Sequence, residues 1–261
     1  MFSLLYMPAF RRALIEKNTL KQPVPALQGF TMLFITDIHA SARTFPKPAV
    51  QKLMNQLHAL KPDLILYGGD FAETPDDAAW LLPMLGQLRP PYGAYAVPGN
   101  NDQSEVASPH PLAALMADAG ITLLVDEEAQ FSVGEAFVRI GGLNAHNLDT
   151  RPSEPFFRDT DENTFRLLLV HYPWHVAEYS QFCVKPPHLA LVGHTHGGQF
   201  RLFGLTPFSL GFELKYLAHQ VGIDGWSERQ GFPTLVSRGI GVSRFPFRLN
   251  APPVVHMITL T

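Results

Sequence analysis

The stretch Gly193-His194-Thr195-His196-Gly197-Gly198-Gln199 follows a short apolar run, residues 189–192, that is typical of a buried strand. Side chains two positions apart on an extended segment point the same way, so His194 and His196 can face one site. Neutral imidazoles bind divalent metals, and the flanking glycines allow a tight turn. The stretch therefore predicts part of a metal site, or else two ordinary polar histidines in a loop.

Carboxylates, an amide and a further pair of histidines stand at the ends of other apolar runs. They are Asp37 and His39 after residues 32–35, Asp70 after residues 64–67, Asn100 and Asp102 after residues 94–97, and His171 after residues 167–170. In an open α/β sheet, ligand sites form beyond the carboxyl ends of the strands. Each residue taken alone is a common turn or core residue, but their repeated placement favours the metal site.

Strand-like and helix-like segments alternate along the first half of the chain, as in a layered α/β protein. Apolar spacing and helix-start signals predict helices over residues 46–60, 74–85, 108–120 and 173–179. Strands are predicted over residues 31–36, 63–67, 92–97, 121–125, 130–133, 137–140, 165–170, 188–192, 234–237 and 254–259. Residues 18–29 are predicted to be extended or loop structure, because they contain two prolines and a glycine. We expect an irregular connection over residues 143–163 and an elaboration near the mouth of the site over residues 201–231.

The ordered motifs Asp-x-His, Gly-Asp, Gly-Asn-x-Asp, His and Gly-His-x-His resemble those of the calcineurin-like metallophosphoesterases. The resemblance covers residues 30–261, and it implies an α/β fold in which a two-sheet β-sandwich is flanked by helices in four αββα layers. We therefore expect a metallophosphoesterase domain over residues 30–261, preceded by an N-terminal extension over residues 1–29.

One bacterial branch of this family is similar in further detail. The extended Gly-His-Thr-His-Gly-Gly-Gln form, the later Ser237-Arg238-Gly239 and the paired prolines 252–253 before the last strand carry this similarity. The branch contains membrane-associated phosphoesterases, some of which hydrolyse UDP-2,3-diacylglucosamine. The resemblance implies a phosphorylated small molecule or a lipid-linked phosphate as the substrate.

The resemblance also implies two divalent metals bridged by Asp70. One metal would be held by Asp37, His39, Asp70 and His196, and the other by Asp70, Asn100, His171 and His194. The family often uses Mn²⁺, and Fe, Zn²⁺ or Mg²⁺ are alternatives that suit these ligands. Two such metals neutralise the phosphoryl oxygens and supply hydroxide at neutral pH, which phosphoester hydrolysis needs.

Asn101 departs from the family pattern, in which most relatives have a histidine at this position. An asparagine can donate a hydrogen bond to a phosphoryl oxygen but cannot deliver a proton to a leaving group. Asp102 is expected to order this loop. His146 is our first candidate for a substitute acid and His175 the second, although a surface histidine is the simpler interpretation of each. The substitution favours phosphoanhydrides, whose leaving groups need no acid, over alkyl esters.

Contacts to the rest of the substrate are less specific in the sequence. Arg43, in the loop after the first ligands, and Arg238 are candidates for phosphate binding, as are Arg244 and Arg248, although an arginine in such a loop is more often an ordinary surface residue. The aromatic residues of the 201–231 segment could flank a lipid or a base, or pack over a sheet.

Composition limits the other classes of function. The net charge is −3 and no large basic block is present, so we expect no nucleic-acid partner. Cys183 is the single cysteine, which suits a reducing cytoplasm. The apolar residues 2–10 and the arginines 11–12 do not have the order of a secretory signal. They predict either packing on the domain or peripheral contact with the inner membrane of a cytoplasmic enzyme.

The resulting hypothesis is a metal-dependent hydrolase of phosphodiesters or phosphoanhydrides. A phosphomonoesterase is the alternative within enzymes. A metal-binding interaction module with weakened catalysis is the alternative outside them, and Asn101 is the feature that favours it.

Overall fold

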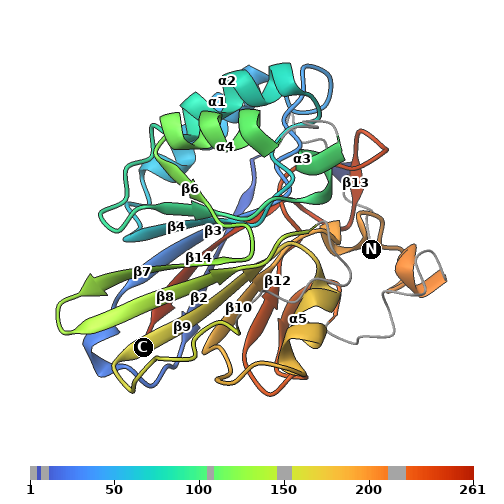
Figure 1. Cartoon of the computed structure of the whole chain (residues 1–261). Coiled ribbons are helices and arrows are strands. Elements are labelled where there is room, and N and C mark those ends of the chain that lie inside the picture. Colours follow the sequence, from blue (N-terminus) through green and yellow to red (C-terminus); the bar gives the residue numbers. More distant parts are fainter. Residues whose placement is uncertain (1–4, 7–11, 105–108, 146–154, 211–221) are drawn as a thin grey trace.

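The computed structural model describes residues 5–6, 12–104, 109–145, 155–210 and 222–261 of the chain. Its described strands form two large sheets and one two-stranded ribbon, in which β1 (Leu5–Tyr6) pairs with β13 (Arg248–Leu249). Figure 1 shows the two large sheets packed face to face, with helices on the outer sides of both. The predicted α/β fold, a two-sheet sandwich flanked by helices, is confirmed.

The first sheet has the strand order β2-β14-β3-β4-β5-β6. Strands β3 to β6 run parallel, and β14 is antiparallel to β3 and parallel to β2. The strands are β2 (Leu14–Leu20), β3 (Thr31–Ile35), β4 (Leu64–Tyr67), β5 (Ala94–Ala96), β6 (Ile121–Leu123) and β14 (Val254–Leu260).

The second sheet has the order β11-β12-β10-β9-β8-β7. Strands β8, β9, β10 and β12 are parallel, and each edge strand is antiparallel to its neighbour. The strands are β7 (Glu127–Val133), β8 (Ala136–Gly142), β9 (Thr164–Val170), β10 (Leu189–Val192), β11 (Gly225–Ser227) and β12 (Thr234–Val236).

Alternating side chains of the central strands divide the core into layers. Met32 and Phe34 of β3 pack between the sheets with Leu167 and Leu169 of β9, whereas the intervening residues of these strands face the helices. Because successive side chains of a strand point to opposite faces, an uninterrupted apolar run can serve two cores at once. The buried apolar runs thus place both sheets in the interior.

Helices cover both outer faces. The helices α1 (Lys47–His58), α2 (Pro75–Leu85) and α4 (Pro109–Asp118) lie over the first sheet, and α5 (Pro173–Ser180) lies over the second (Figure 1). Thr74 caps α2 by accepting a hydrogen bond from the backbone N–H of Asp77, as its sequence predicted. Short helical segments are α3 (Asn100–Ser104) and the 3₁₀ turns η1 (Pro25–Leu27), η2 (His196–Gly198) and η3 (Phe208–Leu210).

Several elements were not predicted. Residues 14–20 form β2, which pairs along its whole length with β14; no strand was predicted there, although extended structure was one of the two predictions for residues 18–29. The irregular 201–231 segment contains β11, and parts of it and of the 143–163 connection lie outside the described residues. Among the helices that the structure describes, none is long and apolar enough to cross a membrane.

Candidate metal centre

The predicted ligands meet at the carboxyl ends of strands from both sheets. Asp37 and His39 follow β3, Asp70 follows β4, and Asn100 begins α3 after β5. The second sheet contributes His171 after β9 and the pair His194 and His196 after β10. Because parallel strands of each sheet end at the same edge, residues far apart in sequence reach one site.

The backbone of this site is unusual. Five of the predicted ligands have positive φ angles, which residues other than glycine rarely adopt. They are Asp37 (51°), His39 (45°), Asp70 (54°), His194 (73°) and His196 (51°). Such conformations cost free energy and persist where the surrounding structure fixes them, which is typical of functional sites.

Glycines allow the loops to pack closely around the carboxylates. A Cβ atom at Gly99 would lie 2.1 Å from Asp70 Oδ1, and one at Gly193 would lie 2.7 Å from Asp37 Oδ2. Any larger residue at either position would therefore displace a carboxylate that the site needs.

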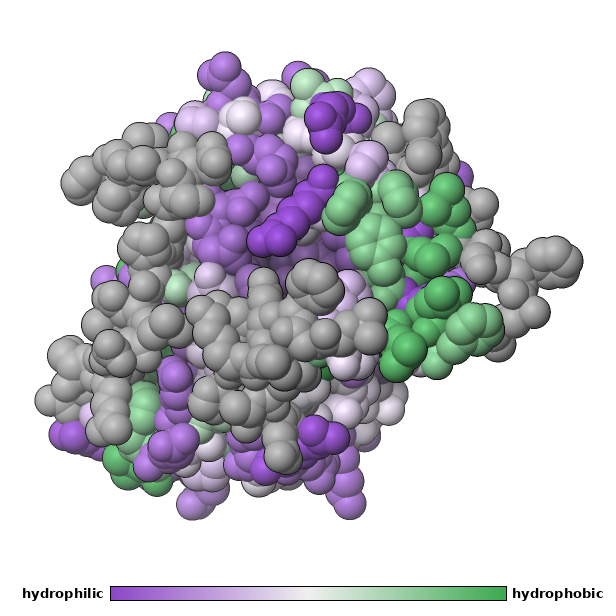
Figure 2. All heavy atoms as spheres, turned by 90° about the vertical axis from the view of Figure 1, so that its right-hand side faces the viewer, coloured by the Kyte–Doolittle hydropathy of each residue, from purple (hydrophilic) through white to green (hydrophobic). Residues whose placement is uncertain are grey.

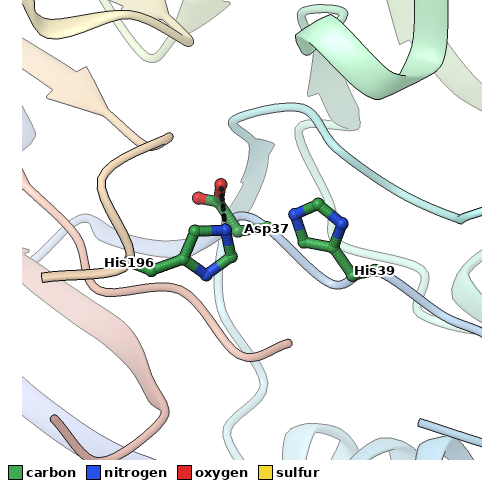
Figure 3. Close-up of side chains that lie close together, drawn as sticks. All are labelled: Asp37, His39 and His196. Carbon is green, nitrogen blue, oxygen red and sulfur yellow. Dashed lines mark ion pairs between the residues drawn. The ribbon is translucent and has the colours of Figure 1, made fainter. Parts of the chain in front are cut away.

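Asp37, His39 and His196 form one group of potential ligands (Figure 3). Their ligand atoms lie within 4.8 Å of one another, and Asp37 Oδ1 is 3.6 Å from His196 Nε2. The rings of His39 and His196 are 4.9 Å apart. All three residues are buried, so a cation held here would be shielded from bulk water.

Asp70 lies between this group and the remaining histidines. Its Oδ2 atom is 3.3 Å from His39 Nε2 and 3.5 Å from His171 Nε2. Asp37, Asp70 and His171 form a second group whose ligand atoms lie within 4.8 Å of one another. One carboxylate oxygen thus faces both halves of the site.

Asn100 joins the histidines of the second half. Its Oδ1 atom lies 3.0 Å from His194 Nδ1 and 3.2 Å from His171 Nε2. The rings of His171 and His194 are 5.1 Å apart and nearly perpendicular. The predicted ligands Asp70, Asn100, His171 and His194 therefore converge, as do Asp37, His39, Asp70 and His196.

The electrostatics of the site suit a cation. Burial raises the pKa of Asp37, whereas for Asp70 burial is outweighed by His171 and His39, which hold its pKa well below the usual range. Burial also lowers the pKa of His39, but the carboxylates of Asp70 and Glu73 outweigh it and raise the pKa to about 10. Buried His39 Nε2 has no hydrogen-bond partner among the described residues and lies 3.3 Å from Asp70 Oδ2, so a metal bound there would take the place of its proton. The donor set therefore fits a divalent cation.

The two histidines after β10, His194 and His196, are held neutral, which is the form that binds metals. Burial and the nearby His171 lower the pKa of His194 to about 3. Burial and the Arg248 guanidinium lower the pKa of His196 well below its usual value.

Outer contacts orient three of the imidazoles. His171 Nδ1 donates to the backbone oxygen of Gly68 at 2.7 Å, and His39 Nδ1 contacts Glu73 Oε1 at 2.5 Å. Fixing Nδ1 in this way directs Nε2 toward the centre. Arg248 lies 3.0 Å from His196 Nδ1 and donates to the backbone oxygen of His196. The roles of Glu73 and Gly68 were not predicted from the sequence.

Arg248 was a candidate for phosphate binding, but the structure buries it completely. Its guanidinium donates to the backbone oxygens of Gly241, His196, Ala251 and Arg238. Burial lowers its pKa to about 9. Arg248 therefore supports the loops around His196 and is not available at the surface.

Asp102 is buried and accepts three backbone hydrogen bonds. The donors are the N–H groups of Gly99 and Asp70 at 2.7 Å and of Phe71 at 2.9 Å. Burial and the charge of Asp70 raise its pKa to about 6. Asp102 thus fixes the loop that carries Asp70, and its carboxylate is occupied by these donors.

Asn101, the departure from the family pattern, lies between the ligand loops. Its backbone N–H donates to Asp70 Oδ1 at 2.9 Å, and its side-chain Nδ2 donates to Glu73 Oε1 at 3.3 Å. The amide therefore touches the carboxylate that orients His39. Its predicted contact with a phosphoryl oxygen stays a prediction.

The two candidate acids differ in what can be said of them. His146 lies outside the described residues. His175 is buried in α5, its ring is 5.3 Å from that of Tyr172, and neither ring nitrogen has a hydrogen-bond partner among the described residues. Burial and the charge of His171 lower its pKa to about 4, so it is neutral at neutral pH.

The two predicted phosphate-binding arginines have different surroundings. Arg238 donates to both carboxylate oxygens of Asp224 and pairs with Glu16, which gives it a structural role. Its contact with substrate stays a prediction. Arg43 is exposed and lines a cavity beside His39 with Glu73 and Arg244.

Comparisons with known proteins show the family to which the chain belongs. Residues 30–198 match the calcineurin-like phosphoesterase family. The phosphodiesterase YaeI of Escherichia coli is 31% identical over 242 residues, which is 88% of this chain and 82% of YaeI. The uncharacterized metallophosphoesterase YkuE of Bacillus subtilis is 28% identical over 236 residues, covering 89% of this chain and 79% of YkuE.

A solved structure has the same fold. The NAD nucleotidase of Haemophilus influenzae superposes with a TM-score of 0.50 and 17% sequence identity over 81% of this chain. This chain spans 45% of that protein, so the likeness concerns one part of it and shows the fold alone. The family match and the E. coli relative lead to one conclusion. The chain belongs to the calcineurin-like phosphoesterase family and is a metallophosphoesterase, a hydrolase of phosphoric esters that depends on divalent metals.

Proposed function

We propose that this enzyme hydrolyses phosphodiesters or phosphoanhydrides at a centre of two divalent metals. The position of Asp70 Oδ2 carries the proposal, because this single oxygen lies 3.3 Å from His39 Nε2 and 3.5 Å from His171 Nε2. A carboxylate that faces two groups of ligands can bridge two cations.

Each metal has its own set of side chains in this proposal. One set is Asp37, His39, Asp70 and His196, and the other is Asp70, Asn100, His171 and His194. When bound, the metals would polarise the phosphoryl oxygens and supply a nucleophile at neutral pH. Mn²⁺ is the metal we propose, because it accepts carboxylate, imidazole and amide ligands together.

The leaving group determines which bonds suit the enzyme. Asn101 cannot transfer a proton, and Asp102 is occupied by three backbone donors. His175 is buried and neutral, which makes it a poor acid. The described residues at the centre therefore favour phosphoryl groups whose leaving groups are stable anions, such as nucleotides or phosphosugars.

A lipid-linked nucleotide similar to UDP-2,3-diacylglucosamine is the substrate class that we propose. The E. coli relative, named a phosphodiesterase, supports a diester-type reaction. The test compares rates on bis-p-nitrophenyl phosphate, p-nitrophenyl phosphate and UDP-sugars, after chelation and after addition of Mn²⁺, Zn²⁺ or Mg²⁺. Faster hydrolysis of the monoester would favour a phosphatase, and metal binding without turnover would favour an interaction module.

We also propose a peripheral contact with the membrane. Figure 2 shows hydrophobic side chains gathered beside a hydrophilic hollow on one face of the molecule. Leu202, Phe203 and Leu205 form a tight turn, and their exposed fractions are 49%, 95% and 52%. We call these three residues the apolar turn. Apolar side chains this exposed favour insertion at a lipid surface.

A further inference from the structure

A cavity of about 360 Å³ lies beside the metal centre. Its walls come from the loop after β3, the start of α2 and the loop that follows β12. Arg43, Glu73, Asp77, Arg244 and Phe245 are among the residues that line it. Glu73 also contacts His39 Nδ1, so one side chain separates the cavity from the ligand cluster.

The acidic side chains of the cavity already have partners. Glu73 contacts His39 and accepts from Asn101, and Asp77 accepts from Thr74 Oγ1 and from Trp80 Nε1. The two arginines differ from them, because neither guanidinium makes a hydrogen bond or ion pair with another described residue. The cavity therefore offers two guanidinium groups that form no direct ion pair with a described residue, on the same walls as the carboxylates of Glu73 and Asp77.

The other arginines near the site, unlike Arg43 and Arg244, have partners for their guanidinium groups. Arg201 and Arg238 pair with Asp224, and Arg248 is surrounded by backbone oxygens. Only Arg43 and Arg244, of the arginines that the structure places on these loops, are left to bind something else. A planar guanidinium offers a pair of parallel donors, which matches phosphate or carboxylate oxygens.

Both arginines stand on loops that are held in place. Gln199, which ends the His194–Gln199 motif, accepts from the backbone N–H of Ser243 and donates to the backbone oxygens of Phe245 and Phe247. Arg244 itself has a positive φ of 59°, a conformation that this loop must fix. On the other side, Ser41 and Thr44 bond to each other across the turn that carries Arg43. The motif that supplies metal ligands thus also positions an arginine of the cavity.

We infer that this cavity is a second anion subsite, in which Arg43 and Arg244 bind a phosphate group of the substrate other than the one that is hydrolysed. The inference rests on the proposed phosphoryl hydrolysis at the adjacent metals. A second anion subsite would favour substrates with two neighbouring phosphates, such as nucleoside diphosphate sugars, over diesters that have a single phosphate.

The test compares Arg43→Gln and Arg244→Gln with wild-type enzyme on two substrates loaded with the same metal. UDP-N-acetylglucosamine has a second phosphate, and bis-p-nitrophenyl phosphate has none. We expect the KM for the UDP-sugar to rise by about tenfold more than the KM for the diester, with kcat changing less than KM, as for a lost charge-assisted hydrogen bond at an exposed site. Arg89→Gln, an exposed arginine outside the cavity, is the matched control.

Equal rises in KM for both substrates would place the arginines at the scissile phosphate and contradict a second subsite. An unchanged KM for both substrates would also contradict it. If the wild type hydrolyses neither substrate, the proposed function fails on its own. In that case calorimetric titration of metal-depleted protein with inorganic pyrophosphate tests the subsite directly. Pyrophosphate binding that is weaker in Arg244→Gln than in the wild type, and unchanged in Arg89→Gln, would support the anion subsite. Absent pyrophosphate binding, or binding that Arg244→Gln leaves unchanged, would overturn the inference.

Discussion

The carboxylate of Asp102 accepts a hydrogen bond from the backbone N–H of Asp70, with 2.7 Å between Oδ2 and N. This bond links the loop after β5 to the loop after β4. The same carboxylate accepts from Gly99 and Phe71. Three donors converge on this buried group, so the position of Asp70, the predicted central ligand, depends on the side chain of Asp102.

Replacing Asp102 with Ala should leave three buried N–H groups without their acceptor. Each unsatisfied group costs about 1–3 kcal/mol, so we expect a marked loss in the free energy of unfolding and weaker metal binding. Asp102→Asn keeps one acceptor oxygen and should lose less. Chemical denaturation and elemental analysis measure the two effects, with Asp159→Asn on the exposed surface as the control. Full metal content in a destabilised Ala variant would show that Asp102 supports folding alone.

If Asp70 bridges two metals as proposed, its removal should affect both of them. Asp70→Ala is expected to abolish activity and to lower the metal content at both positions, because its Oδ2 faces both histidine groups. His196→Ala should weaken the metal held with Asp37, and His194→Ala the one held with Asn100. Elemental analysis of the purified variants checks this. Two metals per chain in Asp70→Ala, or equal losses in the two histidine variants, would contradict the assignment.

The sequence predicted the strand ends and the residues on them, because apolar runs mark parallel strands and polar residues after them mark the ligand edge. It did not predict the contacts made over long distances. Arg248 is fully buried because carbonyl groups from several loops surround it, which no local pattern reveals. Glu73 follows Asp70 closely, but only the fold brings it to His39. Strand β2 was missed because its residues alternate only weakly between buried and exposed.

Asn101→His tests the argument about leaving groups. A histidine here would lie beside Glu73, which now accepts from the Asn101 amide, and this carboxylate would orient the new imidazole. A positioned acid contributes about 10²–10⁴-fold, and a transplanted one should give less, so we expect a moderate rise in turnover on alkyl phosphodiesters. Hydrolysis of phosphoanhydrides should change little or fall. Parallel changes on both substrate classes would mean that Asn101 acts in phosphate binding.

His256 should make the stability of the metal-free protein depend on pH. Burial lowers its pKa to about 4, below the ordinary value of 6.5, so the folded state favours the neutral imidazole that contacts Ser237 Oγ at 3.1 Å. The stabilisation is complete above pH 6.5 and is lost as the pH falls from 6.5 to 4, by up to about 3 kcal/mol.

The measurement is the free energy of unfolding across this pH range in excess chelator. His256→Gln should make the loss less steep and leave the part that His175, His194 and His196 contribute, whereas His58→Gln, at the exposed end of α1, should leave the slope as in the wild type. An equally steep loss in His256→Gln would assign the acid sensitivity to other groups.

The apolar turn should contribute directly to membrane attachment. Phe203 is 95% exposed at a positive φ of 51°, a conformation unfavourable for an aromatic residue, so folding gains nothing from burying this ring. Burying a phenyl ring in lipid gains about 1.5–3 kcal/mol, which predicts that Phe203→Ser binds anionic vesicles at least about tenfold more weakly.

Val184→Ser removes an apolar side chain that is 57% exposed elsewhere and should bind as the wild type does. Vesicle co-sedimentation measures the binding, and hydrolysis of bis-p-nitrophenyl phosphate, expected to stay the same in both variants, shows that the enzyme is intact. Vesicle binding that both substitutions weaken equally, or that neither changes, would exclude the apolar turn as the attachment site.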